Sequence, residues 1–381
     1  MANEGGIPDS YIVILKETSD QGAHVFWVKS LEERYKDSNV LCKLLCEYEA
    51  VKGYAANLTE AALEAVARSP DVEQIVQDTV VTEDGEVEGS GGIEAKVIQC
   101  AYIHYVYDSK LIAAVDTMLP GAWTASAPGM IGTAKTTPNT LTITIVSTQK
   151  GRKLMSMSTP SELGEDNGPK LQASKGRRRG HGTLCAGIIA GKRWGACKEA
   201  RVIAVKITED GKGEGKYAAE GIDWVITQAA GTERLSVINA SFSSPANPAL
   251  DKLAKKAVAA GIHFCAAAGN GREDASHRSP ARVAEVITVG ATSIDDHKEP
   301  KSNFGSAVDI FAPGVHIYSA GIESPTDYYW ATGTSLAAPH VAGVVAYRLY
   351  RKGEQTPEAI REWLIDESVE NALHHIGEGS P

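Results

Sequence analysis

The chain lacks both the long apolar run of a membrane protein and the leader of a secreted one. No stretch in its 381 residues approaches the roughly 18 to 20 apolar residues that span a bilayer. The first residues, Met-Ala-Asn-Glu-Gly-Gly, contain neither the basic nor the apolar part of a signal peptide. As written, the sequence predicts a cytoplasmic protein that does not act at membranes, whereas an upstream signal removed from it would predict a secreted one.

Cysteine patterns typical of metal sites and disulfide frameworks are also missing. The cysteines at 42, 46, 100, 185, 197 and 265 form no CxxC pair and no Cys/His cluster with zinc spacing. Cys42 and Cys46 are four residues apart and would share one face of a helix. Without a secretory signal we expect free thiols rather than a disulfide between them.

An excess of positive charge is absent as well. The chain has 38 Lys and Arg against 48 Asp and Glu, for a net charge of −10. This balance argues against nucleic acid or an anionic membrane as the main partner. Because 43% of the residues are hydrophobic, the chain can build one large domain and a smaller one.

The first part of the chain has the pattern of a small α+β domain, with a ferredoxin-like arrangement expected over residues 1–81. The spacing of the apolar residues, together with the residues that begin and end helices, predicts strands over residues 11–15, 53–58 and 71–81 and helices over residues 22–36 and 59–69. Residues 82–92 are acidic and glycine-rich, which is typical of a solvated linker. We therefore expect a linker and insertion over 82–140, in which 95–106 is apolar enough for a strand and whose role stays open.

From Leu141 the pattern changes to alternating strands and helices, which predicts an α/β domain over residues 141–381. The predicted strands cover 141–146, 202–207, 237–240, 263–268 and 286–289, and the predicted helices cover 182–191, 215–230, 248–260 and 334–350. Strands that are apolar on both faces indicate a parallel sheet covered by helices on both sides. In such sheets, sites form at the carboxyl ends of the strands.

Three short stretches carry residues suited to acyl transfer. Ser335 stands at the mouth of a predicted apolar helix, where unpaired N–H groups and the helix dipole stabilise an anion. His181 is flanked by glycines at the start of another helix, and Asn270 lies between glycines at the end of a strand. Each has a simpler interpretation, as a helix cap, a surface histidine or a turn. Together they supply a nucleophile, a general base and an oxyanion donor. Pro339 is expected to fit the early part of the Ser335 helix without breaking a helical hydrogen bond.

With these motifs the chain resembles the subtilisin-like serine peptidases, and among them the proteinase K branch. Gly-Thr-Ser-Leu-Ala-Ala-Pro-His-Val-Ala-Gly at 333–343 and Gly-His-Gly-Thr-Leu-Cys-Ala-Gly at 180–187 are similar to the family's nucleophile and base motifs, and the run at 303–314 is similar to a segment that precedes the nucleophile. The resemblance implies that Ser335 is the nucleophile, His181 the base and Asn270 the oxyanion donor. It also implies that the first 80 residues are an inhibitory propeptide that occupies the cleft.

One departure from the family concerns the acid of the triad. The family's opening strand ends in aspartate, whereas here Thr-Ile-Thr-Ile-Val is followed by Ser147. That acid orients the base and stabilises its imidazolium. In subtilisin its removal costs about 3 × 10⁴ in kcat, roughly 6 kcal/mol. A carboxylate from the following loop, such as Glu162, Glu165 or Asp166, is an alternative source of charge.

Two further departures affect substrate and metal binding. The family's substrate-binding edge reads Ser-Leu-Gly-Gly, where this chain has Ser241, Phe242, Ser243 and Ser244. The resemblance places these residues, together with Ala267, Ala268 and Gly269, in the substrate site. The family's calcium-binding aspartate is replaced by Ser293, so no metal or other cofactor is expected, and Asp295 and Asp296 are expected to be surface loop residues.

Three functions follow from the sequence. The first is a serine endopeptidase, a hydrolase acting on peptides or proteins through a Ser335 acyl-enzyme, slow because its acid is missing. The second is a pseudopeptidase that binds a peptide or a partner protein in the groove. The third is a cleft reused for non-proteolytic chemistry on a small molecule. The propeptide junction is unlike the family's, so an attached propeptide would keep the cleft occupied.

Overall fold

The computed structural model describes residues 5–35, 41–83, 86–90, 142–146, 155–156, 180–209, 211–230, 232, 234–322 and 327–381. The strand predicted at 95–106, the residue Ser147 and the carboxylates of Glu162, Glu165 and Asp166 lie outside these ranges. Among the described residues, no helix is both long enough and apolar enough to cross a membrane.

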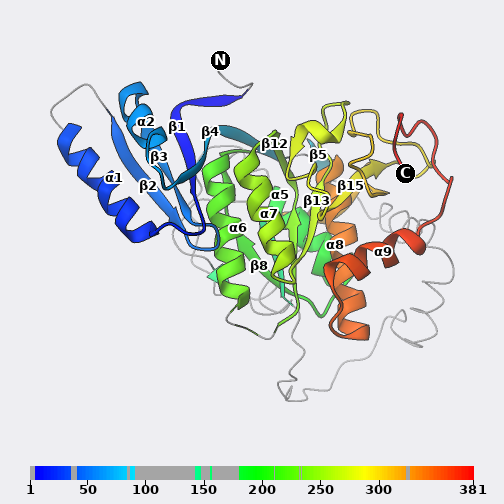
Figure 1. The fold of residues 1–381 in the computed structure, drawn as a ribbon. Coiled ribbons are helices and arrows are strands. Elements are labelled where there is room, and N and C mark those ends of the chain that lie inside the picture. The colour runs from blue at the N-terminus through cyan, green and yellow to red at the C-terminus, as the bar shows by residue number, and fades with distance from the viewer. Residues whose placement is uncertain are drawn as a thin grey trace.

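The N-terminal domain is a four-stranded antiparallel sheet with two helices on its outer face (Figure 1). Its elements are β1 (Gly6–Leu15), α1 (Gln21–Tyr35), β2 (Cys42–Tyr48), β3 (Gly53–Leu58), α2 (Glu60–Ala67) and β4 (Val72–Glu83), and the strand order is β4-β1-β3-β2. Side chains alternate along a strand, so Val13 packs under α1 and α2 while Ile12 faces the large domain. The βαββαβ order confirms the predicted ferredoxin-like domain.

The large domain is built on a mainly parallel sheet. Its strands, in spatial order, are β16 (Ile310–Pro313), β15 (Ile287–Thr292), β13 (His263–Ala267), β11 (Ser236–Ala240), β6 (Thr142–Val146), β8 (Arg201–Val205) and β7 (Met155–Ser156). Only the β7–β8 pair is antiparallel among the described pairs of this sheet. Every strand and helix predicted after residue 140 overlaps an observed one.

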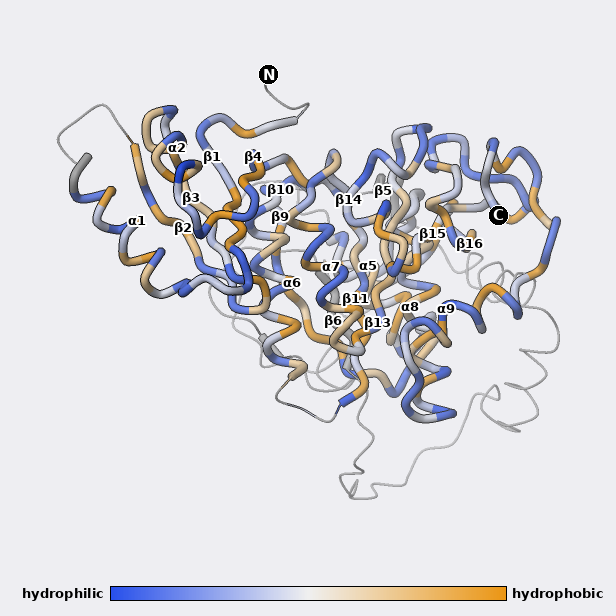
Figure 2. Tube along the Cα trace, viewed as in Figure 1, coloured by the Kyte–Doolittle hydropathy of each residue, from blue (hydrophilic) through white to orange (hydrophobic). Residues whose placement is uncertain are grey.

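Helices cover both faces of this sheet, as predicted. Helices α5 (His181–Ala190), α8 (Thr334–Lys352) and α9 (Pro357–Asp366) share a core with Val237 on one face. Helices α6 (Gly215–Ala230) and α7 (Pro248–Ala259) share a core with Ile238 on the other. Figure 2 shows hydrophobic residues gathered on the strands in the middle of the domain. The second core also includes Ile12 and Ile14 of the N-terminal domain, so the two domains pack through one continuous apolar layer.

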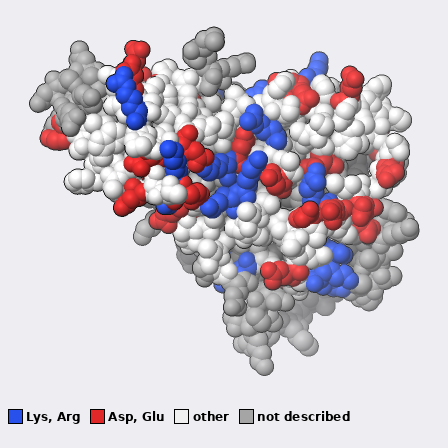
Figure 3. Space-filling view, viewed as in Figure 1, with Lys and Arg blue, Asp and Glu red and all other residues white. Residues whose placement is uncertain are grey.

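The remaining elements are β5 (Glu86–Ser90), β9 (Thr208–Glu209), β10 (Lys212–Glu214), β12 (Phe242–Pro245), the 3₁₀ helix η1 (Ala275–His277), β14 (Arg278–Ser279), β17 (Ile317–Ala320) and β18 (Tyr328–Thr332). Of these, β9, β10, β12 and β14 extend the sheet of the N-terminal domain from β4, and β17, β18 and β5 form a separate three-stranded sheet. Basic and acidic side chains are mixed over the face drawn in Figure 3. The surface ion pairs of Lys252 with Glu73 and of Lys256 with Glu17 link the two domains, in addition to the buried contacts described below.

The structure corrects the expectation that Cys42 and Cys46 lie on a helix. Both belong to β2, which pairs with β3 through a register shift between Leu44 and Cys46. The alternating exposure of β2 matches a strand with one buried face, so the pairing with β3 decides the local structure. Both thiols are free, and burial raises the pKa of each to about 11.

The structure also corrects the linker predicted over residues 82–92. Strand β4 runs on to Glu83, and residues 86–90 form β5, which pairs with β18. The acidic, glycine-rich composition has low intrinsic strand propensity. The edges of β12 and β18 nevertheless offer backbone hydrogen bonds to a strand of almost any sequence, and this pairing decides the outcome.

Candidate active site

Two helix starts bring His181 and Ser335 together. His181 is the first residue of α5, after Gly180, whose φ of +63° lies in the left-handed region. Ser335 is the second residue of α8. The Nε2 atom of His181 lies 2.9 Å from Oγ of Ser335, and both side chains are buried. This is hydrogen-bond distance between a candidate base and a candidate nucleophile.

Pro339 removes one backbone hydrogen bond near the start of α8. It lies inside the helix, so the carbonyl of Ser335 cannot receive the usual hydrogen bond from the residue four positions later. The hydroxyl of Ser241 donates to that carbonyl at 2.8 Å, and the thiol of Cys185 lies 3.5 Å from it. The expectation that Pro339 breaks no helical hydrogen bond is therefore wrong. The hydrogen bond to the carbonyl of Ser335 is missing, and the side chains of Ser241 and Cys185 contact that carbonyl in its place. The Ser241 hydroxyl therefore supports the backbone of Ser335, and the predicted contact of Ser241 with substrate stays a prediction.

Asn270 faces the same helix start. Its Oδ1 accepts the backbone N–H of Thr334 at 3.1 Å, and the donor group of this amide is its nitrogen. The N–H of Ser335 lies in the first turn of α8, where the helix itself offers no partner. A side-chain amide and a backbone N–H placed this way are the parts of an oxyanion hole.

Asn303 holds the loop that carries Asn270. Its Nδ2 donates to the carbonyl of Ala268 at 2.8 Å, and its Oδ1 accepts the N–H of Gly271 at 2.9 Å. A Cβ on Gly269 would lie 2.5 Å from Nδ2 of Asn303, and the φ of Gly269 is +99°, so glycine is required there. Ala267 and Ala268 are fully buried beneath the loop. The sequence analysis quoted Asn303 only as part of a family-like run and missed this positioning role.

Strand β4 of the N-terminal domain lies along the predicted substrate-binding edge. In antiparallel pairing with β12, Glu83 is opposite Phe242 and Thr82 is opposite Ser243. The other edge of β4 pairs with β10, where Val81 is opposite Gly213. The chain thus fills its own cleft as an added strand. Ser244 is buried too, and its hydroxyl donates to the carbonyl of Pro245 at 2.9 Å.

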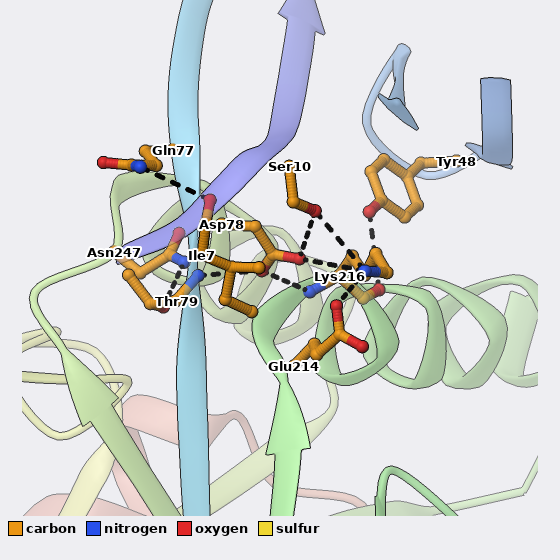
Figure 4. Close-up of polar contacts among 9 residues, drawn as sticks. All are labelled: Ile7, Ser10, Tyr48, Gln77, Asp78, Thr79, Glu214, Lys216 and Asn247. Atoms are coloured by element: carbon orange, nitrogen blue, oxygen red, sulfur yellow. Dashed lines mark hydrogen bonds and ion pairs between the residues drawn. The ribbon is translucent and has the colours of Figure 1, made fainter. Parts of the chain in front are cut away.

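A buried polar cluster fixes this strand to the large domain (Figure 4). The Asp78 carboxylate accepts the backbone N–H of Lys216 at 3.0 Å, at the start of α6, and the hydroxyl of Ser10 at 3.0 Å. The ammonium of Lys216 lies 3.5 Å from Asp78 and also contacts Glu214. Burial disfavours that ammonium, but Glu214 and Asp78 outweigh it and raise the pKa of Lys216. An anion at a helix start and a paired cation together make a strong docking point.

The sequence analysis missed one carboxylate at the site, that of Glu83. Its Oε2 lies 3.7 Å from Nδ1 of His181, and the side chains are 2% and 1% exposed. Its Oε1 accepts the hydroxyl of Thr208 at 2.6 Å. No local pattern in the sequence marks this residue, because its contact with His181 depends on the pairing of β4 with β12.

The described residues do not form a metal site. They contain no group of three or more His, Cys, Asp or Glu that could hold a metal ion. In the loop after β15 the N–H of Ser293 donates to the carbonyl of His297 at 2.9 Å. The ammonium of Lys298 donates to the carbonyls of Glu299 and Ser302, the kind of oxygen that a calcium ion would need. The loop therefore does not fit the family's calcium ion, and no step below uses a metal.

Comparison with known proteins identifies the class to which this fold and site belong. Residues 156–379 match the model of the subtilase family, peptidase S8, and residues 10–83 match the peptidase inhibitor I9 model. The chain belongs to the subtilase family and carries an I9-type propeptide domain. The family and fold predicted from the sequence are thus confirmed, as is the serine-protease character at the level of the family.

Individual relatives to which the chain is similar are also named as subtilisin-like proteases. The chain is 31% identical to subtilisin-like protease 8 of Arthroderma otae, with 100% of this chain and 81% of the relative covered. It is 30% identical to the subtilisin-like serine protease Pen ch 18 of Penicillium rubens, with 98% and 79% covered. Among solved structures it is similar to a cold-adapted subtilisin-like serine proteinase, with a TM-score of 0.53 and 30% identity over 64% of this chain and 87% of that one.

Proposed function

We propose that the protein is a serine endopeptidase that acts through an acyl-enzyme on Ser335, slowly, because Ser147 stands where the family has its acid. The observation that carries the proposal is the 2.9 Å approach of His181 Nε2 to Ser335 Oγ. A serine that merely caps a helix has no need of a buried histidine at this distance. The placement of the Asn270 amide at the same helix start supports the same function.

The chemistry follows from these positions. As Oγ of Ser335 bonds to the substrate carbonyl carbon, its proton passes to Nε2 of His181, and the carbonyl oxygen takes negative charge near Asn270 and the N–H of Ser335. The imidazolium then gives the proton to the leaving amine as the C–N bond breaks. Water next attacks the ester, with His181 taking its proton and returning one to Oγ of Ser335.

The strand pairings indicate where the chain would cut itself. Glu83 ends β4 opposite Phe242, and Glu86 begins β5 opposite Thr332, three residues before Ser335. Glu83 thus lies on the strand next to Ser241, whose hydroxyl contacts the carbonyl of Ser335. Glu86 lies opposite the end of the strand that leads into α8. We expect self-cleavage between Glu83 and Glu86.

Peptide hydrolysis distinguishes an enzyme from a pseudopeptidase, for which the well-formed groove is the favouring observation. We expect the wild-type protein to hydrolyse a chromogenic peptide and Ser335→Ala to bind the same peptide without hydrolysing it. Progress curves and a fluorescence binding titration on both proteins measure this. Binding by both with turnover by neither, at any pH, would favour the pseudopeptidase. A co-purifying non-peptide ligand would favour small-molecule chemistry.

A further inference from the structure

The environment of Glu83 suggests that the carboxylate does more than fill the cleft. Both its oxygens are engaged within the protein, one by Thr208 at 2.6 Å and the other facing His181 Nδ1 at 3.7 Å. A buried carboxylate is costly unless it is paired or hydrogen-bonded. Thr208 and His181 together form a small subsite that accepts a carboxylate.

Glu83 faces the Nδ1 side of the His181 ring. Nε2 is directed to Ser335, so Nδ1 is the nitrogen that a triad acid would orient. At 3.7 Å the two atoms are too far apart for a direct hydrogen bond, and the contact becomes an ion pair when His181 takes up a proton. A negative charge at this distance still favours the imidazolium that forms during attack.

We propose that Glu83 is a positioning residue that provides, from the propeptide strand, the negative charge that Ser147 cannot bring to His181. This inference rests on the proposed function. In this role Glu83 takes no part in proton transfer, which runs between Ser335, His181 and the substrate. The chain therefore cuts itself faster than it cuts peptides in general, and as a peptidase it selects substrates with an acidic side chain at the position opposite Phe242.

Among the described residues, the other groups that contact this pair carry no negative charge near neutral pH. Cys185 is one turn further along α5, and burial raises the pKa of its thiol to about 12, with the charge of Glu83 adding to the rise. From α8 and β9 the pair is met by the hydroxyls of Ser335 and Thr208, which carry no charge near neutral pH. A change in the pH profile on neutralising Glu83 therefore reports on His181.

The test is the rate of self-cleavage in the full chain, followed by intact mass from pH 5 to 10 in wild type, Glu83→Gln and Glu83→Asp. We expect Glu83→Gln to be slower by roughly 10- to 100-fold, a fraction of what a directly bonded acid is worth. The loss should depend on pH, because the neutralised variant lacks the negative charge that favours the protonated form of His181. Glu83→Asp, with a carboxylate set back by one methylene, should be intermediate.

Glu73→Gln is the matched control. It removes the same charge from the same strand, but from an exposed pair with Lys252, and should cleave at the wild-type rate. In the Ser147→Asp background the loss caused by Glu83→Gln should shrink to less than about 3-fold, since the restored acid makes it redundant. Peptides copying residues 74–92 with Glu or Gln at position 83 test the preference in trans, and the Glu peptide should be cut faster.

The outcomes separate the two proposals. Wild-type cleavage with no loss in Glu83→Gln, or a loss equal at every pH and equal in both backgrounds, overturns the role of Glu83. No cleavage of the wild-type chain or of either peptide overturns the proposed function itself.

Discussion

Replacing Ser147 with aspartate should raise kcat for a chromogenic peptide by about 10³- to 10⁴-fold, measured after removal of the propeptide domain. His181 and Ser335 are already at hydrogen-bond distance, and Asn270, the proposed oxyanion donor, contacts the start of α8. The group expected to be missing is the acid that holds the imidazole and stabilises its charge. Steady-state kinetics on both proteins measure the gain.

The control for this gain is Ser147→Asn, which is close to aspartate in size but carries no charge. It should leave kcat near the wild-type value. A gain in Ser147→Asp that Ser147→Asn reproduces would mean that packing, not charge, limits the enzyme. No gain in either would mean that the cleft is blocked or serves another chemistry.

Removing the base should cost very different amounts in the two backgrounds. In subtilisin, loss of the triad histidine costs about 2 × 10⁶ in kcat and loss of the aspartate about 3 × 10⁴. Dividing the first loss by the second gives the loss in kcat expected on removing the histidine from an enzyme that already lacks its aspartate, which is about 10²-fold. We therefore expect His181→Ala to lower kcat by roughly 10²-fold in the wild type and about 10⁶-fold in Ser147→Asp.

This pair of comparisons forms a double-mutant cycle that reports the coupling between positions 147 and 181. Active-site titration of each preparation corrects kcat for the fraction of folded enzyme. Equal losses in both backgrounds would show that residue 147 does not act through His181, and would contradict the assignment of Ser147 to the acid position.

The elements around the site could be predicted because their signals are local. In the helix that begins at His181 and in the strand that ends before Ala268, the regular spacing of apolar residues and the glycines at the ends of the element all lie within a short stretch of sequence. Gly269 is needed for a positive φ and for close approach of Asn303, and such a requirement is visible as a glycine in the sequence. Because such local signals alternate between strand and helix along the chain, the α/β fold class could be predicted from them.

What the sequence could not show depends on pairing between distant segments. Strand β5 has a composition typical of a linker and is a strand only because β18, more than 200 residues later, offers an edge. Ser241 seemed suited to contact substrate, but Pro339 leaves the carbonyl of Ser335 without a partner and Ser241 supplies it. Glu83 reaches His181 only because β4 lies beside β12. None of these contacts leaves a local signal in the residues that make it.

The most direct test of the central claim, that His181 and Ser335 form a working nucleophile, is labelling with a fluorophosphonate and mapping of the adduct by peptide mass spectrometry. The folded protein with its propeptide removed should carry one adduct, on Ser335, and Ser335→Ala should carry none. Absence of any adduct on Ser335 in that folded preparation would contradict the claim.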